Sequence, residues 1–179
     1  MLELDFMILD WVQSHLRCGF LDTVVPWVTL LGEYGAVWIA LALVLMLKKN
    51  TRPLGFAVAA ALAVDVLVCN VILKPLVARP RPFALRPEIT LLVKAPWDYS
   101  FPSGHTAASF AAVAALVQRK SRLWIPALVL AAAISLSRIY LYVHYPSDVL
   151  CGALLGLACG FAGAYFAGKW MEFCKNRKK

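Results

Sequence analysis

The chain has 179 residues, of which 61% are hydrophobic and 16% are charged, and its mean hydropathy is +0.72. A soluble fold of this size cannot bury so much apolar surface, so the composition excludes an ordinary soluble domain. A lipid environment permits only helices or closed barrels. The long unbroken apolar runs favour helices, because barrel strands alternate between apolar and polar residues.

The formal net charge is +8, and the cations gather at the ends of apolar segments rather than over one face. This pattern indicates membrane topology and argues against nucleic-acid binding. The five cysteines show no metal-ligand spacing. Composition and charge together predict an all-α membrane protein with neither a nucleic-acid partner nor a cysteine metal site.

The first predicted element is an amphipathic helix over residues 1–15 that lies at the membrane interface. Its apolar side is expected to carry Leu4, Ile8, Trp11 and Val12, with Asp5, Asp10 and Gln13 elsewhere. Six apolar helices follow, at 20–31, 34–48, 54–76, 103–118, 122–140 and 147–169. We therefore expect residues 1–179 to form a single integral membrane domain, a bundle of six transmembrane helices.

Basic clusters at 48–52, 119–122 and 169–179 fall at alternate ends of these helices. The positive-inside rule makes those ends cytoplasmic. It also places 75–102 and 141–146 together on the opposite side and both termini inside. The outer loop is itself basic, so its cations need a reason other than topology.

The first segment on that side runs from Lys74 to Pro82, KPLVARPRP. Its prolines end the helix and hold the chain extended, because the ring removes a backbone donor and restricts the preceding residue. Three cations are thereby held on a stiff strap. A basic helix end that meets lipid headgroups would give the same pattern.

The second segment, Phe101 to Thr106 (FPSGHT), precedes an alanine-rich helix. Ser103 suits the N-cap position, and the amide of Gly104 would point unpaired N–H toward an anion. His105 in the first turn would place a proton donor beside that anion. Ordinary helix capping with a structural histidine is the alternative for this segment alone.

The third segment runs from Ser137 to Asp148, SRIYLYVHYPSD. Arg138 and Asp148 lie at the margins of apolar helices, where ionised groups are costly unless paired or functional. Asp148 follows His144 by four residues, so its carboxylate can hold one ring nitrogen and leave the other free to attack. A structural His–Asp pair that closes a loop is the alternative. The predicted topology nevertheless brings all three segments to one face.

These residues resemble the type 2 phosphatidic acid phosphatases, a superfamily that also contains vanadium-dependent haloperoxidases. The motifs Lys-x6-Arg-Pro, Pro-Ser-Gly-His and Ser-Arg-x5-His-x3-Asp are all met, at Lys74 with Arg81-Pro82, at Pro102 to His105, and at Ser137-Arg138 with His144 and Asp148. The motif core spans 74–148, and the resemblance implies a six-helix membrane core around it.

The resemblance also implies roles for these residues. His144 would attack phosphorus to give a phosphohistidine, Asp148 would orient it, and His105 would protonate the leaving oxygen. Lys74, Arg81 and Arg138 would hold the phosphoryl oxygens with Ser103 and the Gly104 amide. Three cations would then do what Mg²⁺ does elsewhere, so neither a metal nor another cofactor is expected.

Residues outside the motifs receive plainer interpretations. Arg79, Arg86, Lys94 and Asp98 are expected to be loop charges or headgroup contacts. Trp97, Tyr99, Tyr140, Tyr142 and Tyr145 are expected to form an interfacial belt. A stripe of small residues follows the last predicted helix, at Gly152, Gly156, Gly160 and Gly163. We expect this stripe to pack inside the bundle rather than between two subunits, and a homodimer is the alternative.

The sequence therefore predicts a lipid phosphatase of a bacterial inner membrane, with its site facing the periplasm or exterior and a lipid phosphate as substrate. By family analogy undecaprenyl diphosphate is favoured, with phosphatidylglycerophosphate or phosphatidic acid as alternatives. A carrier or flippase that binds lipid phosphates without hydrolysis is the alternative of another class. It would need the cations but not an attacking histidine.

Overall fold

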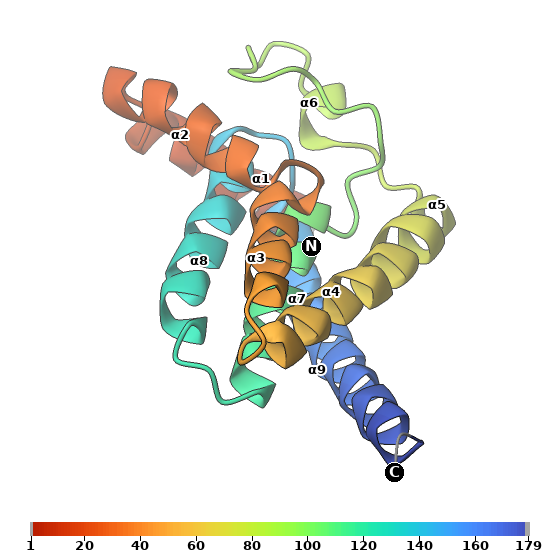
Figure 1. The fold of residues 1–179 in the computed structure, drawn as a ribbon. Coiled ribbons are helices and arrows are strands. Elements are labelled where there is room, and N and C mark those ends of the chain that lie inside the picture. Colours follow the sequence, from red (N-terminus) through yellow and green to blue (C-terminus); the bar gives the residue numbers. More distant parts are fainter. Residues whose placement is uncertain (1, 178–179) are drawn as a thin grey trace.

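The apolar segments of the sequence form helices throughout residues 2–177, the part of the chain that the computed structural model describes, and this part contains no strand (Figure 1). In chain order the elements are α1 (Leu2–His15), α2 (Gly19–Leu31), η1 (Glu33–Gly35), α3 (Ala36–Leu47), α4 (Arg52–Asp65), the π-helical η2 (Val66–Leu73), α5 (Lys74–Val77), α6 (Pro82–Leu85), α7 (Gly104–Gln118), α8 (Trp124–Tyr140) and α9 (Pro146–Asn176). The predicted all-helical class is confirmed.

The glycine stripe of α9 packs against the alanine-rich α7 at very close range. A Cβ atom added at Gly156 would lie 2.2 Å from the carbonyl oxygen of Ala107, and one added at Gly160 would lie 2.4 Å from that of Ala111. Small residues allow this approach, which replaces bulky packing with backbone contact. The prediction that the stripe packs inside the bundle is confirmed, so a homodimer would have to use another surface.

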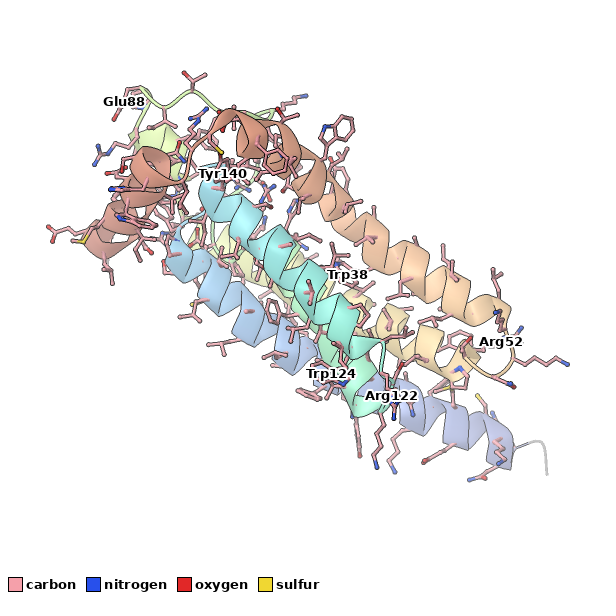
Figure 2. All side chains as sticks on the ribbon, turned by 90° about the vertical axis from the view of Figure 1, so that its left-hand side faces the viewer. Trp38, Arg52, Glu88, Arg122, Trp124 and Tyr140 are labelled. Carbon is pink, nitrogen blue, oxygen red and sulfur yellow. The ribbon has the colours of Figure 1, made fainter. Side chains whose placement is uncertain are left out.

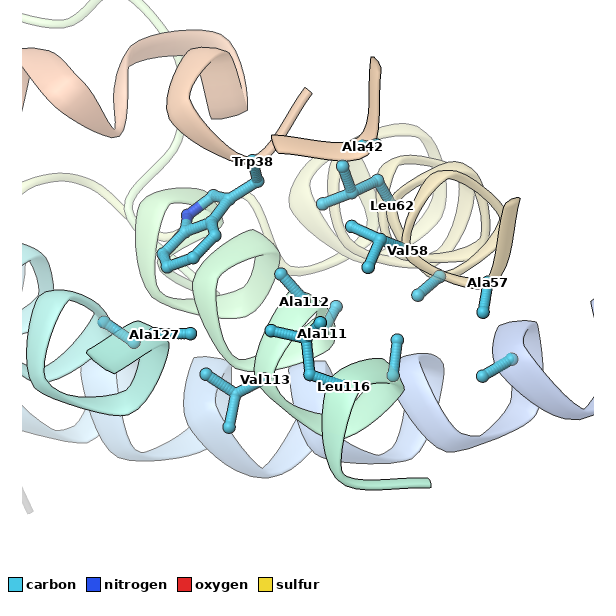
Figure 3. Close-up of a cluster of buried hydrophobic side chains, with 14 of the residues drawn as sticks. Trp38, Ala42, Ala57, Val58, Leu62, Ala111, Ala112, Val113, Leu116 and Ala127 are labelled. Carbon is cyan, nitrogen blue, oxygen red and sulfur yellow. The ribbon is translucent and has the colours of Figure 1, made fainter. Parts of the chain in front are cut away.

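The apolar core fills the space where α3, α4, α7 and α8 meet (Figure 3). Trp38 of α3 is its largest side chain and is 2% exposed. The indole Nε1 donates a hydrogen bond to Ser109 Oγ at 2.9 Å, and that hydroxyl donates to the carbonyl oxygen of His105 at 2.7 Å. The core is therefore bonded directly to the first turn of α7, where the second motif lies.

The helices expected at 20–31 and 34–48 form one broken helix rather than two passes. The axes of α2 and α3 differ by 43° at the break, where separate passes would require the chain to reverse. Tyr34 and Gly35 make the break with positive φ angles of 49° and 70°. Within residues 2–177 the chain thus runs the length of the bundle five times, through α2–α3, α4–α5, α7, α8 and α9. The six-helix count is not supported, because two short helices separated by glycines resemble a hairpin in sequence.

The two ends of the bundle hold different turns and loops (Figure 2). The turns at 48–52 and 119–122, with Arg52 and Arg122, lie at one end, which we call the basic end. Glu88 and Tyr140 lie at the other, the loop end, which holds 78–103 and 141–145. By length and composition, the segments that begin at Arg52 and Pro146 can each cross a membrane, and the bent pair would add a third.

The N-terminal helix α1 lies at the loop end, not at the basic end. Its Gln13 side chain donates to the carbonyl oxygen of Tyr140 at 2.8 Å, and Asp5 accepts from the amide of Ser147 at 2.9 Å. The expectation that both termini lie opposite the motifs is therefore wrong for the N-terminal helix. The error follows from the miscounted passes, since an odd number of passes puts the two ends of a bundle on opposite sides.

The face of α1 that packs against the protein is largely distinct from its predicted apolar side, which is expected to lie at the membrane interface. Asp5, Leu9 and Val12 are buried, whereas Leu4 and Trp11 of the predicted apolar side are exposed. Helical periodicity alone could not show that an aspartate belongs to the packed face, because its partners come from distant segments.

Three tyrosines of the predicted belt are buried instead. Tyr142 donates to Asp10 of α1 and Tyr140 to Asp22 of α2, each at 2.7 Å, so both hydroxyls dock the N-terminal helices. Tyr145 packs edge-on against Phe6 of α1. Trp97 is 93% exposed, which leaves it free to face lipid or solvent.

Candidate active site

The first motif forms a strap at the loop end. Lys74 begins the one-turn helix α5, Ala78 ends it with a φ of 48°, and the prolines around Arg81 carry the chain across to α6. Lys74 and Arg81 are 7% and 5% exposed. The strap therefore holds two cations away from solvent, as its proline content predicts.

The two buried cations share the carboxylate of Asp98. Its Oδ1 accepts from Arg81 Nη2 at 2.5 Å, while Oδ2 forms an ion pair with the ammonium of Lys74. Burial opposes ionisation of Asp98, but the hydrogen bonds and charges of Lys74 and Arg81 outweigh it and lower the pKa of this carboxyl to about 2. Asp98 is thus an anion bound to two cations of the first motif, and its expected role as a loop charge or headgroup contact is wrong.

His144 lies in the loop between α8 and α9 and is 1% exposed. Its Nε2 is 3.1 Å from Nη1 of Arg81, and the same Nη1 donates to the carbonyl oxygen of Val143 at 2.6 Å. Burial and then the positive charges of Arg81, Arg138 and Lys74 lower the pKa of His144 well below its usual value. The ring is therefore neutral near pH 7, with a lone pair on Nε2 if Nδ1 carries the proton.

Asp148 lies behind His144 and is fully buried. Its Oδ2 is 3.6 Å from Nδ1 of His144, and it accepts from the Ser100 hydroxyl at 2.5 Å and from the amide of Tyr145 at 3.0 Å. Ser100 Oγ is also 3.5 Å from His144 Nδ1. The predicted His–Asp pair is in contact, but the serine hydroxyl supplies the shorter hydrogen bond to the carboxylate.

The second motif forms the first turn of α7, which begins beside Lys74 of the strap. A Cβ atom at Gly104 would lie 3.8 Å from Lys74 Nζ, so the helix terminus and this cation are neighbours. His105 Nε2 has no hydrogen-bond partner within residues 2–177 and lies 3.5 Å from Oε2 of Glu33. Ser103 is fully buried, and its hydroxyl accepts from Thr106 at 3.1 Å.

Arg138 reaches the same place from the end of α8. It is 3% exposed, and its Nη1 donates to the hydroxyl of Thr29 at 2.5 Å. Nε has no hydrogen-bond partner in the described part of the chain. A guanidinium with unused donors is suited to bind a further oxygen anion.

The three segments surround one cavity of about 1160 Å³, which extends from the strap toward α2 and α3. Its wall includes six of the predicted site residues, Lys74, Arg81, Gly104, His105, Arg138 and His144. Ser103 and Asp148 lie behind this wall. Two histidines therefore face a space rimmed by three cations, an arrangement that can neutralise the charge of a phosphoryl group and supply a nucleophile and a proton donor.

Four neighbours of the site are not predicted by the sequence: Asp5, Arg79, Asp98 and Ser100. Arg79 bonds to Asp5 and Asp148, so it too is not the expected loop charge or headgroup contact. The unusual number of charged residues in the outer loop indicates that the loop has a function. It does not show which of these charges pair with one another.

Comparison with known proteins identifies relatives along most of the chain. The model of the PAP2 superfamily matches residues 50–172. An undecaprenyl-diphosphatase of Sulfolobus acidocaldarius is 36% identical over 129 residues, covering 70% of this chain and 62% of that protein. A decaprenylphosphoryl-5-phosphoribose phosphatase of Mycobacterium tuberculosis is 41% identical over 151 residues, covering 83% and 82%. The match thus spans less than two thirds of the Sulfolobus relative.

Solved structures show the same likeness. The transmembrane PAP2-type phosphatidylglycerolphosphate phosphatase of Bacillus subtilis has a TM-score of 0.74 and 27% identity, covering 93% of this chain and 86% of that one. LpxE of Aquifex aeolicus has a TM-score of 0.69 and 30% identity, covering 90% and 93%. The Sulfolobus and Mycobacterium relatives and the Bacillus subtilis structure are named phosphatases, which supports the predicted enzyme class. The chain belongs to the PAP2 superfamily, as its three motifs predict.

Proposed function

We propose that the protein is a membrane-embedded phosphatase that hydrolyses a phosphate ester or diphosphate of a lipid through a phosphohistidine at His144. One observation carries the proposal: Nε2 of His144 lies 3.1 Å from Arg81 at the wall of a cavity that Lys74, Arg138 and His105 also line. A binding protein needs the cations but no nucleophile among them.

In the proposed first step, Nε2 attacks phosphorus while the bond to the leaving oxygen breaks and His105 gives that oxygen a proton. Water then attacks phosphorus while its bond to Nε2 of His144 breaks, His105 takes a proton from that water, and orthophosphate leaves. Lys74, Arg81 and Arg138 neutralise the phosphoryl oxygens throughout, with the Gly104 amide at the N-terminus of α7. Arg81 would exchange its contact with His144 Nε2 for one with the phosphoryl group. Direct contact between Ser103 and phosphate stays an expectation, because its hydroxyl is buried.

We infer that residues 1–179 form one membrane domain with the basic end in the cytoplasm and the loop end at the periplasm or exterior. The basic turns at 48–52 and 119–122 and the end of α9 support this orientation. It places α1 on the outer side, with its exposed Leu4, Met7, Ile8 and Trp11 available to the membrane interface. The bent α2–α3 helix would then count as one crossing.

Undecaprenyl diphosphate is the substrate we favour, since relatives at 32–36% identity carry that name. The Mycobacterium relative adds a specific second candidate, a polyprenyl-linked sugar phosphate. Phosphatidylglycerophosphate and phosphatidic acid complete the set. All of these lipids carry a phosphate and at least one hydrocarbon chain. The hydrocarbon chain can contact the apolar part of the cavity wall, which includes Leu30, Ile39 and Leu62.

Phosphate release from these four lipids, measured in detergent with EDTA present, tests the proposal. We expect turnover of at least one polyprenyl substrate that EDTA does not reduce. Binding of a lipid without release of phosphate would favour the carrier or flippase. Loss of activity in EDTA with recovery on adding Mg²⁺ would contradict the metal-free mechanism.

Substitution of Asp98 by Asn is expected to lower the inhibition constant of orthophosphate about tenfold. A phosphate that binds Lys74 and Arg81 must displace the carboxylate of Asp98, and the amide removes that competing charge. Glu88→Gln is the matched control, because Glu88 lies on the same loop, is 60% exposed in its side chain and contacts Arg86. An unchanged or raised inhibition constant in Asp98→Asn would show that Asp98 does not compete with phosphate.

A further inference from the structure

Arg79, which belongs to none of the three motifs, joins the N-terminal helix to the carboxylate behind His144. Its Nη1 donates to Asp148 Oδ1 at 2.5 Å and to Ser147 Oγ at 2.8 Å, while Nη2 donates to Asp5 Oδ2 at 2.8 Å. The guanidinium carbon lies 3.8 Å above the ring of Tyr145. Planar geometry and five donors suit arginine to bridge two carboxylates in this way.

Asp5 is fixed on the far side of this bridge. Its Oδ1 accepts from the amide of Ser147 at 2.9 Å, and its Oδ2 accepts from the Ser147 hydroxyl at 2.6 Å. Helix α1 is thereby bonded to the first turn of α9, in which Asp148 lies. The side chains of Asp5 and Asp148 are 4% and 0% exposed. Water therefore cannot readily replace a lost contact with Arg79, and its loss would leave a buried charge without a partner.

The two carboxylate oxygens of Asp148 have different partners, one on the side of Arg79 and one on the side of His144. Oδ1 is taken by Arg79, while Oδ2 faces Ser100, the Tyr145 amide and His144. Rotation of the carboxylate would break the Arg79 bond. The charge of Arg79 also offsets that of Asp148, which would otherwise favour the protonated form of His144.

We infer that Arg79, held by Asp5, is a positioning residue for the proposed reaction: it fixes the orientation of Asp148 and, through Asp148, the ring of His144. The inference rests on the proposed function. It gives the N-terminal helix a part in the site, although α1 contributes no residue to the cavity wall. Outer contacts of this kind typically change activity 10- to 100-fold when removed, on the order seen for residues behind metal ligands.

Charged and titratable groups from every neighbouring element surround the pair formed by His144 and Asp148. They are Asp5 of α1, Lys74 of α5, Arg79 and Arg81 of the strap, Asp98 of the loop, His105 of α7 and Arg138 of α8. Of these, Arg79 contacts Asp148 from the side away from the cavity. Its removal therefore changes the charge behind His144 without deleting a cation from the cavity wall.

The test compares Arg79→Gln, Arg79→Lys and Asp5→Asn in the full-length protein with a lipid that the wild type hydrolyses. For Arg79→Gln we expect kcat to fall about 100-fold while KM changes less than about threefold. The acid limb of the kcat profile should move to higher pH, because loss of a positive charge raises the pKa of His144. Arg79→Lys should keep the limb near the wild-type pH but lower kcat, since an ammonium retains the charge and loses the bridge.

Asp5→Asn should lower kcat about tenfold, and Asp10→Asn is its control on the same helix. Asp10 accepts from Tyr142 and lies 3.7 Å from Arg86, so it also docks α1 but does not reach Asp148. A purely structural role would lower the melting temperature of both variants and leave kcat per folded molecule and the pH limb unchanged.

The outcomes separate the inference from the proposed function. A folded Arg79→Gln protein with wild-type kcat and acid limb overturns the inference alone. If Arg79→Gln does not fold, a wild-type kcat and limb in Asp5→Asn overturns it equally. A wild-type protein that releases phosphate from no lipid removes the proposed function, and the inference with it.

Discussion

Substitution of His144 by Asn is expected to reduce phosphate release from a lipid substrate by about 1,000-fold or more. The amide keeps a polar group beside Arg81 and Asp148 but supplies no nitrogen lone pair that can attack phosphorus. Loss of the nucleophile removes the covalent step of the proposed reaction. Initial rates on the same lipid, normalised to folded protein, measure the effect.

The matched control is His15→Asn, since His15 lies on α1, stacks on Trp11 and is exposed. Wild-type protein quenched during turnover of a ³²P-labelled lipid should carry an acid-labile, alkali-stable label, and His144→Asn should not. Residual turnover close to that of His15→Asn would assign the nucleophile elsewhere. It would leave the cation cluster as a binding site and favour the carrier or flippase.

The motif residues could be predicted from the sequence because their chemistry is costly in lipid. Arg138, His144 and Asp148 stand at the margins of apolar helices, where an ionised group needs a partner or a function. The alternation of basic turns then brought their segments to one end, and the structure places six of the expected residues on one cavity wall. Charge and order along the chain were sufficient for this step.

The pairing around the site could not be predicted, because it depends on contacts between distant segments. Arg79 meets Asp5 across 74 positions of sequence, and no periodicity connects them. Asp98 resembles any loop carboxylate until Lys74 and Arg81 are seen on either side of it. The predicted number of passes was wrong for a related reason. Gly32 and Gly35 indicate a break in a helix, but they do not show the angle between the two parts.

Substitution of Gly156 by Ala is expected to destabilise the protein by about 3 kcal/mol, a large effect for one methyl group. The new Cβ would lie 2.2 Å from the carbonyl oxygen of Ala107 and 3.0 Å from its Cα, so backbone rather than a flexible side chain would have to move. Ala107 follows His105 by two residues in the first turn of α7. Displacement of this turn should therefore also lower kcat, by about 10- to 100-fold.

Gly168→Ala is the control on the same helix, because its Cβ would meet only the flexible end of Arg119, at 3.2 Å. Alanine is the better helix former, so this variant should be as stable as the wild type or up to about 1 kcal/mol more stable. Thermal unfolding in detergent, read beside lipid phosphatase activity, distinguishes the two sites. Equal melting temperatures would mean that α7 and α9 do not approach as closely as their glycines and alanines permit.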